Sequence, residues 1–360
     1  MRRPVFLLAV FIPVAIALEL AHADPVLIFS AAALGVIPTA ALMGMATEEL
    51  AARSGPGIGG LLNVTFGNAP ELIIAFFALL EGLQEVVKAS IVGSIIGNIL
   101  LVLGAAMVFG GWKRDKQTFN ATAAGAQSAM LLLALAALIL PALWQLIHGG
   151  GLPHVGAEEV DFGSDLEHLS FGVALVLILS YLFGLLFSLK THRELFNPYT
   201  EDHEETLGWS TKRSLAMLGI AAVAVGVMSE ILVGSISEAS KDIGLSEFFV
   251  GVFVVAIVGN AAEHWVAVLV AMKNKMDLAV NIAIGSSAQI ALFVAPLLVL
   301  ASFVVGDHPM ALVFNGYEIG ALVLAVLVAN FLTQDGESNW FEGVQLLSLY
   351  AVFGLVFYYA

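Results

Sequence analysis

The pentapeptide Gly67-Asn68-Ala69-Pro70-Glu71 returns 192 residues later as Gly259-Asn260-Ala261-Ala262-Glu263, each time inside a long apolar segment. A carboxylate in the hydrocarbon layer of a membrane costs roughly 2.5–3.5 kcal/mol even on lenient insertion scales, so it is rarely there without a function. Finding it twice, in the same local sequence, constrains the fold to two related half-chains. We interpret Glu71 and Glu263 as the contributions of these halves to one shared cation site.

Composition places the chain in a bilayer. Hydrophobic residues make up 59% of its 360 residues and charged residues 12%, whereas soluble domains have roughly 45–50% and 25%. The absence of cysteine excludes disulfides, thiolate metal sites and cysteine nucleophiles. The net charge of −15 argues against nucleic acid as a partner. The expected partners are therefore cations and the lipid bilayer, and a homo-oligomer is compatible with the sequence.

Eleven apolar segments are long enough to span a bilayer, which predicts an all-α polytopic membrane protein with about 11 transmembrane helices. After the first segment, ten remain as two sets of five. Because five is odd, the second set enters the membrane from the opposite side, which predicts an inverted repeat. The segments are 4–21, 25–46, 59–81, 87–110, 122–147, 169–189, 213–236, 246–272, 278–304, 311–333 and 340–359. The predicted organisation is an N-terminal helix (1–24), a first five-helix repeat (25–190), an acidic cytoplasmic linker (191–212) and a second, inverted repeat (213–360).

Other motifs keep the same spacing, which supports duplication. Chance similarity between apolar segments would not hold one register across several motifs. The matching pairs are Gly59 with Gly251 and Gly93-Ser94 with Gly285-Ser286 at an offset of 192, and Phe119-Asn120 with Phe314-Asn315 at an offset of 195. Glu318 lies in an apolar segment but has no acidic counterpart, since Ala123 stands at the matching position, so we interpret Glu318 as structural or at a subunit contact.

Positive charges predict the orientation. With a cytoplasmic N-terminus, twelve of the fourteen Lys and Arg residues lie at cytoplasmic ends, and only Lys88 and Lys241 lie opposite. The short termini favour a prokaryotic plasma membrane. Arg2-Arg3, the first apolar stretch and Ala21-His22-Ala23 also fit a cleaved signal peptide. Whether the first segment is cleaved or kept, the next helix begins on the non-cytoplasmic side of the membrane.

Each signature predicts a loosened helix with oxygen ligands. Gly and Asn are weak helix formers, and Pro70 removes a backbone donor. Carbonyls freed at membrane depth are tolerable only where they line a cavity or bind something. Two halves then offer two carboxylates and several neutral oxygens, which suits Ca²⁺ with its six to eight oxygen ligands. The predicted metal ligands are Glu71, Glu263, Asn68 and Asn260.

A second set of polar residues follows on the next helix of each half. Ser94 and Asn98 lie four residues apart, with Gly93 and Gly97 beside them for close helix approach. Ser286 and Gln289 lie three apart, so either pair can share a helix face. We interpret these residues as lining a cation or proton pathway, and plain hydrogen bonding between helices is the alternative.

Together these motifs resemble the Ca²⁺/cation–proton antiporters of the cation/Ca²⁺ exchanger superfamily, over residues from about 30 to 358. The resemblance implies an eleven-helix antiporter in which the two signature glutamates form a central Ca²⁺ site, reached alternately from each side. The sodium-coupled branch typically has Ser or Thr where Asn68 and Asn260 stand, and this chain departs from that pattern. The segments that carry the resemblance are the two signatures, His264, Gly285-Ser286-Ser287-Ala288-Gln289-Ile290, Lys190-Thr191-His192 and Ser338-Asn339-Trp340-Phe341-Glu342-Gly343. The acidic cluster at 201–205 resembles the family's acidic segment but is short, and it fits a solvated turn or a cation sensor.

The paired charges of Glu71 and Glu263 predict coupling to protons. Two carboxylates in a low-dielectric site repel each other unless a cation compensates them. One Ca²⁺ or two protons neutralise the site, and the empty ionised site is costly. Only a site that holds Ca²⁺ or protons can then close and open to the other side of the membrane, which predicts antiport of at least two protons per Ca²⁺. These ions are substrates, and no cofactor is expected. Candidates for a third proton are His264, Glu48, Glu49 and Glu230, of which Glu48 and Glu49 also fit a helix end facing water.

Three alternatives stay open at this point. The exchanged cation could be Mn²⁺, Na⁺ or K⁺, because the geometry of the oxygen ligands decides selectivity. A Ca²⁺-permeable channel is a second reading, although a channel needs no paired titratable acids in an inverted repeat. A membrane metalloenzyme is the third, and the sequence lacks a His-Glu-x-x-His pair or a comparable ligand cluster. We therefore expect a secondary transporter and no enzyme.

Overall fold

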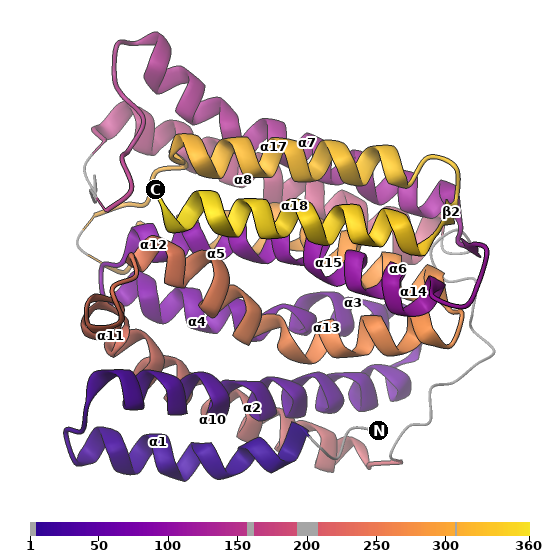
Figure 1. Ribbon diagram of the computed structural model, residues 1–360, viewed down its shortest axis with the longest axis horizontal. Coiled ribbons are helices and arrows are strands. Elements are labelled where there is room, and N and C mark those ends of the chain that lie inside the picture. The colour runs from indigo at the N-terminus through magenta and orange to yellow at the C-terminus, as the bar shows by residue number, and fades with distance from the viewer. Residues whose placement is uncertain (1–4, 157–161, 193–207, 307) are drawn as a thin grey trace. The chain divides into compact units, whose positions relative to one another are not determined.

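The computed structural model describes residues 5–156, 162–192, 208–306 and 308–360, and this part of the chain is mostly helical (Figure 1). The acidic cluster at 201–205 lies outside the described residues. Within them, eight helices are long and apolar enough to cross a membrane, which confirms the all-α polytopic class. They are Pro25–Arg53, Gln84–Gly111, Ala121–Ile147, Ser164–Thr191, Thr211–Gly234, Glu247–Met272, Met276–Ser302 and Trp340–Tyr358.

The other three predicted segments form helices of different kinds. The first and the tenth are the shorter apolar helices Val5–Leu20 and Gly316–Leu332. The third is a bent pair, Leu61–Gly67 and Ala69–Leu80, whose members differ in direction by 41°. Eleven spans thus stay a prediction.

The tenth segment also begins later than predicted. Residues 311–315 are not helical, and helix α17 (Gly316–Leu332) starts at Gly316. The reason is a capping box: the Asn315 side chain accepts a hydrogen bond from the backbone of Glu318, and the Glu318 carboxylate accepts one from the backbone of Asn315. This confirms the structural interpretation of Glu318.

The described chain divides into two compact units. The first comprises residues 1–77, 180–244 and 258–262, and the second comprises residues 78–179, 245–257 and 263–360. Each unit therefore contains residues from both predicted repeats.

In the first unit, the long helix α2 (Pro25–Arg53) packs along α1 (Phe11–Leu20) and α10 (Thr211–Gly234) (Figure 1). Helix α2 starts where it does because the Asp24 side chain accepts hydrogen bonds from the first backbone N–H groups, and Pro25 needs no such bond. The remaining elements of this unit are η1 (Val5–Val10), α3 (Gly55–Gly67), most of α4 (Ala69–Leu80), the end of α8 (Ser164–Leu186), η3 (Phe187–Thr191) and α11 (Ile236–Ile243).

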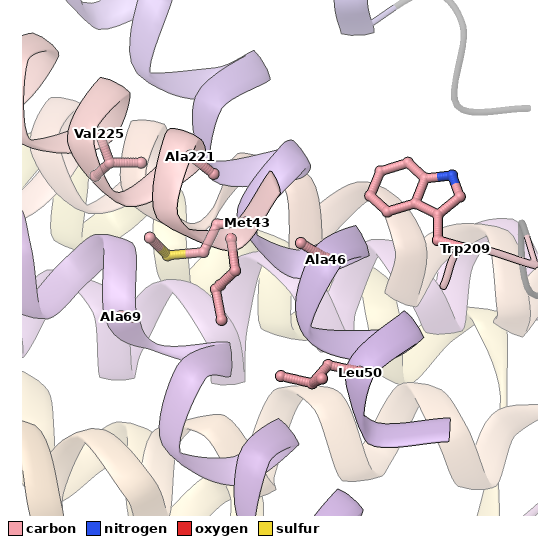
Figure 2. Packing of buried hydrophobic residues seen from close by; sticks show 8 residues of the cluster. Met43, Ala46, Leu50, Ala69, Trp209, Ala221 and Val225 are labelled. Atoms are coloured by element: carbon pink, nitrogen blue, oxygen red, sulfur yellow. The ribbon is translucent and has the colours of Figure 1, made fainter. Parts of the chain in front are cut away.

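A buried apolar cluster joins these helices (Figure 2). It includes Ala69, which lies inside the first signature. The cluster thus packs the signature against the pair formed by α2 and α10. Its members are Met43, Ala46 and Leu50 of α2, Ala69, Trp209, and Leu218, Ala221 and Val225 of α10.

Glu49 lies at one edge of this cluster, and its surroundings differ from the prediction. Its side chain is buried, whereas a water-facing helix end was expected. The carboxylate accepts a hydrogen bond of 3.0 Å from the backbone N–H of Trp209. The Arg213 guanidinium lies over the Trp209 ring, 4.8 Å from its centre. The Glu49 carboxylate therefore joins α2 to the residues that directly precede α10.

The second unit contains the remaining helices and a short two-stranded sheet. The sheet pairs β1 (Gln117–Thr118) antiparallel with β2 (Glu337–Ser338). The helical elements are the end of α4, α5 (Gln84–Ile96), η2 (Gly97–Val102), α6 (Leu103–Gly111), α7 (Ala121–Ile147), most of α8, α12 (Glu247–Phe249), η4 (Val250–Val255), α13 (Ala256–Met272) apart from its residues 258–262, α14 (Met276–Val280), η5 (Asn281–Gly285), α15 (Ser286–Gln289), η6 (Ile290–Val294), α16 (Ala295–Ser302), α17 and α18 (Trp340–Tyr358).

Helix α5 crosses η4 at a glycine. A methyl group at Gly93 would lie 2.7 Å from Cα of Val252 and closer still to its carbonyl oxygen, so only glycine fits there. The predicted close approach is thereby confirmed for Gly93. It is wrong for Gly97, where a methyl group would meet no atom within 4 Å. Gly97 instead begins the π-helical segment η2.

Candidate cation site

The first signature breaks its helix at Asn68, as predicted. Helix α3 ends there, and α4 begins at Ala69, which places Glu71 in the first turn of α4. Backbone N–H groups at a helix start have no partner within the helix and favour a negative charge. Both Asn68 and Glu71 are buried. The break therefore places an amide and a carboxylate together at a helix N-terminus.

The second signature does not break its helix, so the prediction is wrong for this half. Helix α13 runs without interruption through Gly259–Glu263. The physical reason is Ala262, which stands where Pro70 stands in the first signature and keeps its backbone donor. Irregular backbone precedes the signature instead, as the π-helical segment η4.

Within the first unit, Glu71 packs against the glycine of the second signature. A methyl group at Gly259 would lie 3.5 Å from Cγ and 3.7 Å from Oε1 of Glu71, and 3.4 Å from Cδ1 of Ile74. Asn260, the next residue, is fully buried. The fold thus gathers the predicted ligands Asn68, Glu71 and Asn260 in one unit. This role of Gly259 was not predicted, although its presence in both signatures was the available signal.

Within the second unit, two predicted pathway residues bond to the end of the second signature and to His264, which follows it. Ser286 Oγ donates a hydrogen bond of 3.0 Å to Glu263 Oε2. Asn98 Oδ1 lies 3.2 Å from Nε2 of His264. The second contact joins a residue of the first half-chain to one of the second half. The polar residues of both halves therefore meet on α13.

The remaining predicted residues lie on three other helices. Ser94 is buried on α5, and Gln289 is half-buried at the end of α15. Glu230 is exposed on α10 of the first unit. In the described part of the chain, no group of three or more His, Asp or Glu side chains is placed to hold a metal ion.

Two π-helical segments occupy matching places in the two halves. The segment η2 covers Gly97–Val102, and η6 covers Ile290–Val294, which matches it at the offset of 192. The wider turn of a π-helix disturbs the regular hydrogen bonds of the backbone and is frequent at functional sites. Asn98 lies on the first segment, and Gln289 directly precedes the second.

Comparison with known proteins gives consistent matches over nearly the whole chain. The family model described as sodium/calcium exchanger protein matches residues 25–190 and 213–359. A Ca(2+)/H(+) antiporter of Aphanothece halophytica is 44% identical over 368 residues, covering 98% of this chain and 96% of that protein. The Ca(2+)/H(+) antiporter ChaA of Bacillus subtilis is 42% identical over 356 residues, covering 98% and 97%. The structure of native YfkE matches with a TM-score of 0.83 at 39% identity, covering 99% of this chain and 100% of that chain.

Proposed function

The chain belongs to the sodium/calcium exchanger protein family, and from this membership we propose that it exchanges Ca²⁺ for protons across a membrane. It is a multi-pass membrane protein, and two relatives that match nearly its whole length are Ca²⁺/H⁺ antiporters. The observation that carries the proposal is the pair of glutamates, Glu71 and Glu263, one in the signature of each half.

The proposed midmembrane site is formed by Glu71 and Glu263, with Asn68 and Asn260 as further ligands. Its support comes from α13. This helix carries Gly259, against which Glu71 packs, and one turn later it carries Glu263. The Ser286 hydroxyl donates a hydrogen bond to the Glu263 carboxylate and so helps to orient it. Carboxylate and amide oxygens are the ligands that Ca²⁺ prefers.

The proposed mechanism is alternating access governed by charge. With Ca²⁺ bound, or with two protons bound, the two carboxylates are compensated and the site can pass through an apolar environment. Empty and ionised, the site holds two uncompensated charges, which are costly away from water. Transport in one direction is therefore coupled to proton movement in the other. The eleven spans, the inverted repeat, the cytoplasmic N-terminus and the prokaryotic plasma membrane belong to the same proposal.

The experiment that tests this function is Ca²⁺ uptake into proteoliposomes with and without an imposed pH gradient. We expect uptake only when the gradient is present. Uptake that ignores the pH gradient would contradict proton antiport and favour a channel, and uptake that follows an imposed Na⁺ gradient would favour sodium coupling. Gradient-driven flux of Mn²⁺ or K⁺ in place of Ca²⁺ would keep the mechanism and change the substrate.

The bond from Ser286 to Glu263 gives a further prediction. Hydrogen bonds to charged groups contribute about 1.5–3 kcal/mol, so Ser286→Ala should raise the Ca²⁺ concentration for half-maximal uptake about tenfold or more. The neighbouring Ser287→Ala is the matched control, because Ser287 donates mainly to Ala283 of its own helix, at 2.8 Å. Equal half-maximal concentrations in the two variants would remove Ser286 from the site.

A further inference from the structure

One side-chain hydrogen bond in the second unit joins the two half-chains directly beside the second signature. The carbonyl oxygen Oδ1 of Asn98 lies 3.2 Å from Nε2 of His264. A carbonyl oxygen can only accept a hydrogen bond, so Nε2 carries the hydrogen and the imidazole is the donor. His264 directly follows Glu263 on α13, and Asn98 lies on the π-helical segment η2. The bond therefore connects the helix that carries Glu263 to a helix of the other half-chain.

Asn98 is an unfavourable residue for packing alone. Its side chain is 1% exposed, and within the described residues its amide nitrogen Nδ2 has no hydrogen-bond partner. A buried N–H group without a partner is destabilising, and an apolar residue of similar size would avoid that cost. What the asparagine adds at this position is the bond to His264.

The π turn itself does not require an asparagine. In η2 the backbone carbonyl of Asn98 accepts the hydrogen bond of the π turn, and in η6 the backbone carbonyl of Ile290 does the same. Ile290 corresponds to Asn98 at the offset of 192, and Leu72 corresponds to His264. The other half of the duplicated chain thus has two apolar residues in place of the bonded pair. The repeat forms without this bond, so the bond is specific to the surroundings of the second signature.

Two bonds hold α13 where the second signature ends. Ser286 at the start of α15 donates to Glu263 Oε2 at 3.0 Å, and Asn98 on η2 accepts from His264. Successive side chains of an α-helix point about 100° apart, so these two bonds act on α13 from different directions. A rotation of α13 about its own axis would break at least one of them. Both bonds together therefore set the direction of the Glu263 carboxylate.

We propose that Asn98 is a positioning residue for the Ca²⁺ site. By accepting the hydrogen bond from His264, it fixes the rotation of α13 and with it the direction of the Glu263 carboxylate. This inference rests on the proposed function, because it assigns Asn98 a role in the Ca²⁺ affinity of the same site. The His264 imidazole then serves as a hydrogen-bond donor within the protein and not as the carrier of a third proton.

The first test transplants the apolar pair of the other half into the full chain, as Asn98→Ile with His264→Leu. Replacing both partners of a bond by apolar groups is nearly neutral for stability, whereas replacing one leaves the other unpaired. Each single variant should therefore melt at a lower temperature in detergent, and the double variant should melt close to the wild type. The Ca²⁺ concentration for half-maximal uptake into proteoliposomes should instead rise about three- to tenfold in all three variants, with the maximal rate nearly unchanged.

The matched control is another buried bond between the half-chains of the second unit. The hydroxyl groups of Ser128 on α7 and Thr333 at the end of α17 lie 3.0 Å apart, and both residues are 1% exposed. Ser128→Ala with Thr333→Val should leave the half-maximal Ca²⁺ concentration unchanged. If the double variant of Asn98 and His264 recovers both its melting temperature and its half-maximal concentration, the bond only stabilises the fold and the inference is overturned.

The variant His264→Gln separates positioning from proton transport. Glutamine presents an amide N–H group near the place of the imidazole Nε2, and its side chain does not titrate. We expect a half-maximal Ca²⁺ concentration close to that of the wild type and well below that of His264→Leu, with uptake that still requires the pH gradient. Uptake that no longer depends on the gradient in His264→Gln would make His264 a proton carrier and overturn the inference.

A measurement without transport separates this inference from the proposed function. The ring ¹⁵N signals of neutral His264, identified by their absence in His264→Leu, should show the hydrogen on Nε2. In Asn98→Ile this preference should be lost. If wild-type proteoliposomes show no gradient-driven Ca²⁺ uptake, the proposed function fails, while the ¹⁵N signals still decide whether the bond exists. If uptake is present and the hydrogen lies on Nδ1, or does not respond to Asn98→Ile, only the positioning role fails.

Discussion

Gradient-driven Ca²⁺ uptake is expected to fall to the level of empty liposomes when either Glu71 or Glu263 is replaced by Gln. Glutamine has nearly the same shape, so the packing of Glu71 against Gly259 and the bond from Ser286 to Glu263 can largely persist. What is lost is one of the two charges that a divalent cation compensates, together with one proton-binding group. A neutral amide cannot alternate between a protonated and an ionised form, so the coupling itself is removed.

The control for this loss is Glu238→Gln, an exposed carboxylate on α11, which should transport as the wild type does. Size-exclusion profiles of all three variants should match the wild type, because no packing is changed. Glu71→Asp and Glu263→Asp keep the charge but shorten its reach by one methylene, and we expect reduced uptake in both. Full uptake in Glu71→Gln or in Glu263→Gln would remove the central claim.

Gly93→Ala is expected to have the largest effect on stability. A methyl group there meets the backbone of Val252, which cannot move aside as a flexible side chain can, so α5 and η4 must separate. Overpacking of this kind costs about 1–3 kcal/mol and occasionally more. The expected result is a sharp loss of monodisperse protein in detergent, seen by size exclusion, and a much lower melting temperature of what remains.

Gly97→Ala is the matched control. It lies four residues further along, and its methyl group meets open space. This variant should purify and melt close to the wild type. If the Gly93 and Gly97 variants melt at the same temperature, the tight crossing of α5 and η4 is not what stabilises the second unit.

Most of the helical layout could be predicted from hydropathy, because every backbone group in a bilayer must be satisfied within helices. The helix break at Asn68 was predictable from Pro70, because proline lacks the backbone N–H group that a continuous helix needs. The non-helical start of the segment 311–333 was not predictable. Its residues are as apolar as those of a helix, and what decides their conformation is a capping box at Asn315 and side-chain partners from distant helices. A hydropathy profile does not contain information about hydrogen-bond partners on distant helices.

In the candidate site, the residues that occur in both half-chains could be predicted, whereas the contacts between the half-chains could not. Duplication alone identified Glu71, Glu263 and their neighbouring amides, because two acids in apolar segments at one offset are improbable without a function. The contacts of Asn98 with His264, and of Glu71 with Gly259, join different half-chains. A comparison of one half with the other cannot reveal which residues meet across them. Lys88 was likewise predicted only as one of two basic residues opposite the cytoplasmic ends, and its burial was not predicted.

The interleaving of the two units has a consequence for biosynthesis. The first unit draws its last residues, 258–262, from the second half of the chain, and these residues include the glycine against which Glu71 packs. A ribosome therefore delivers the first glutamate long before it delivers that neighbour. Until α13 has been inserted, Glu71 lacks the glycine against which it packs. We therefore expect membrane chaperones and quality-control proteases to bind the incomplete protein most strongly at this stage of assembly.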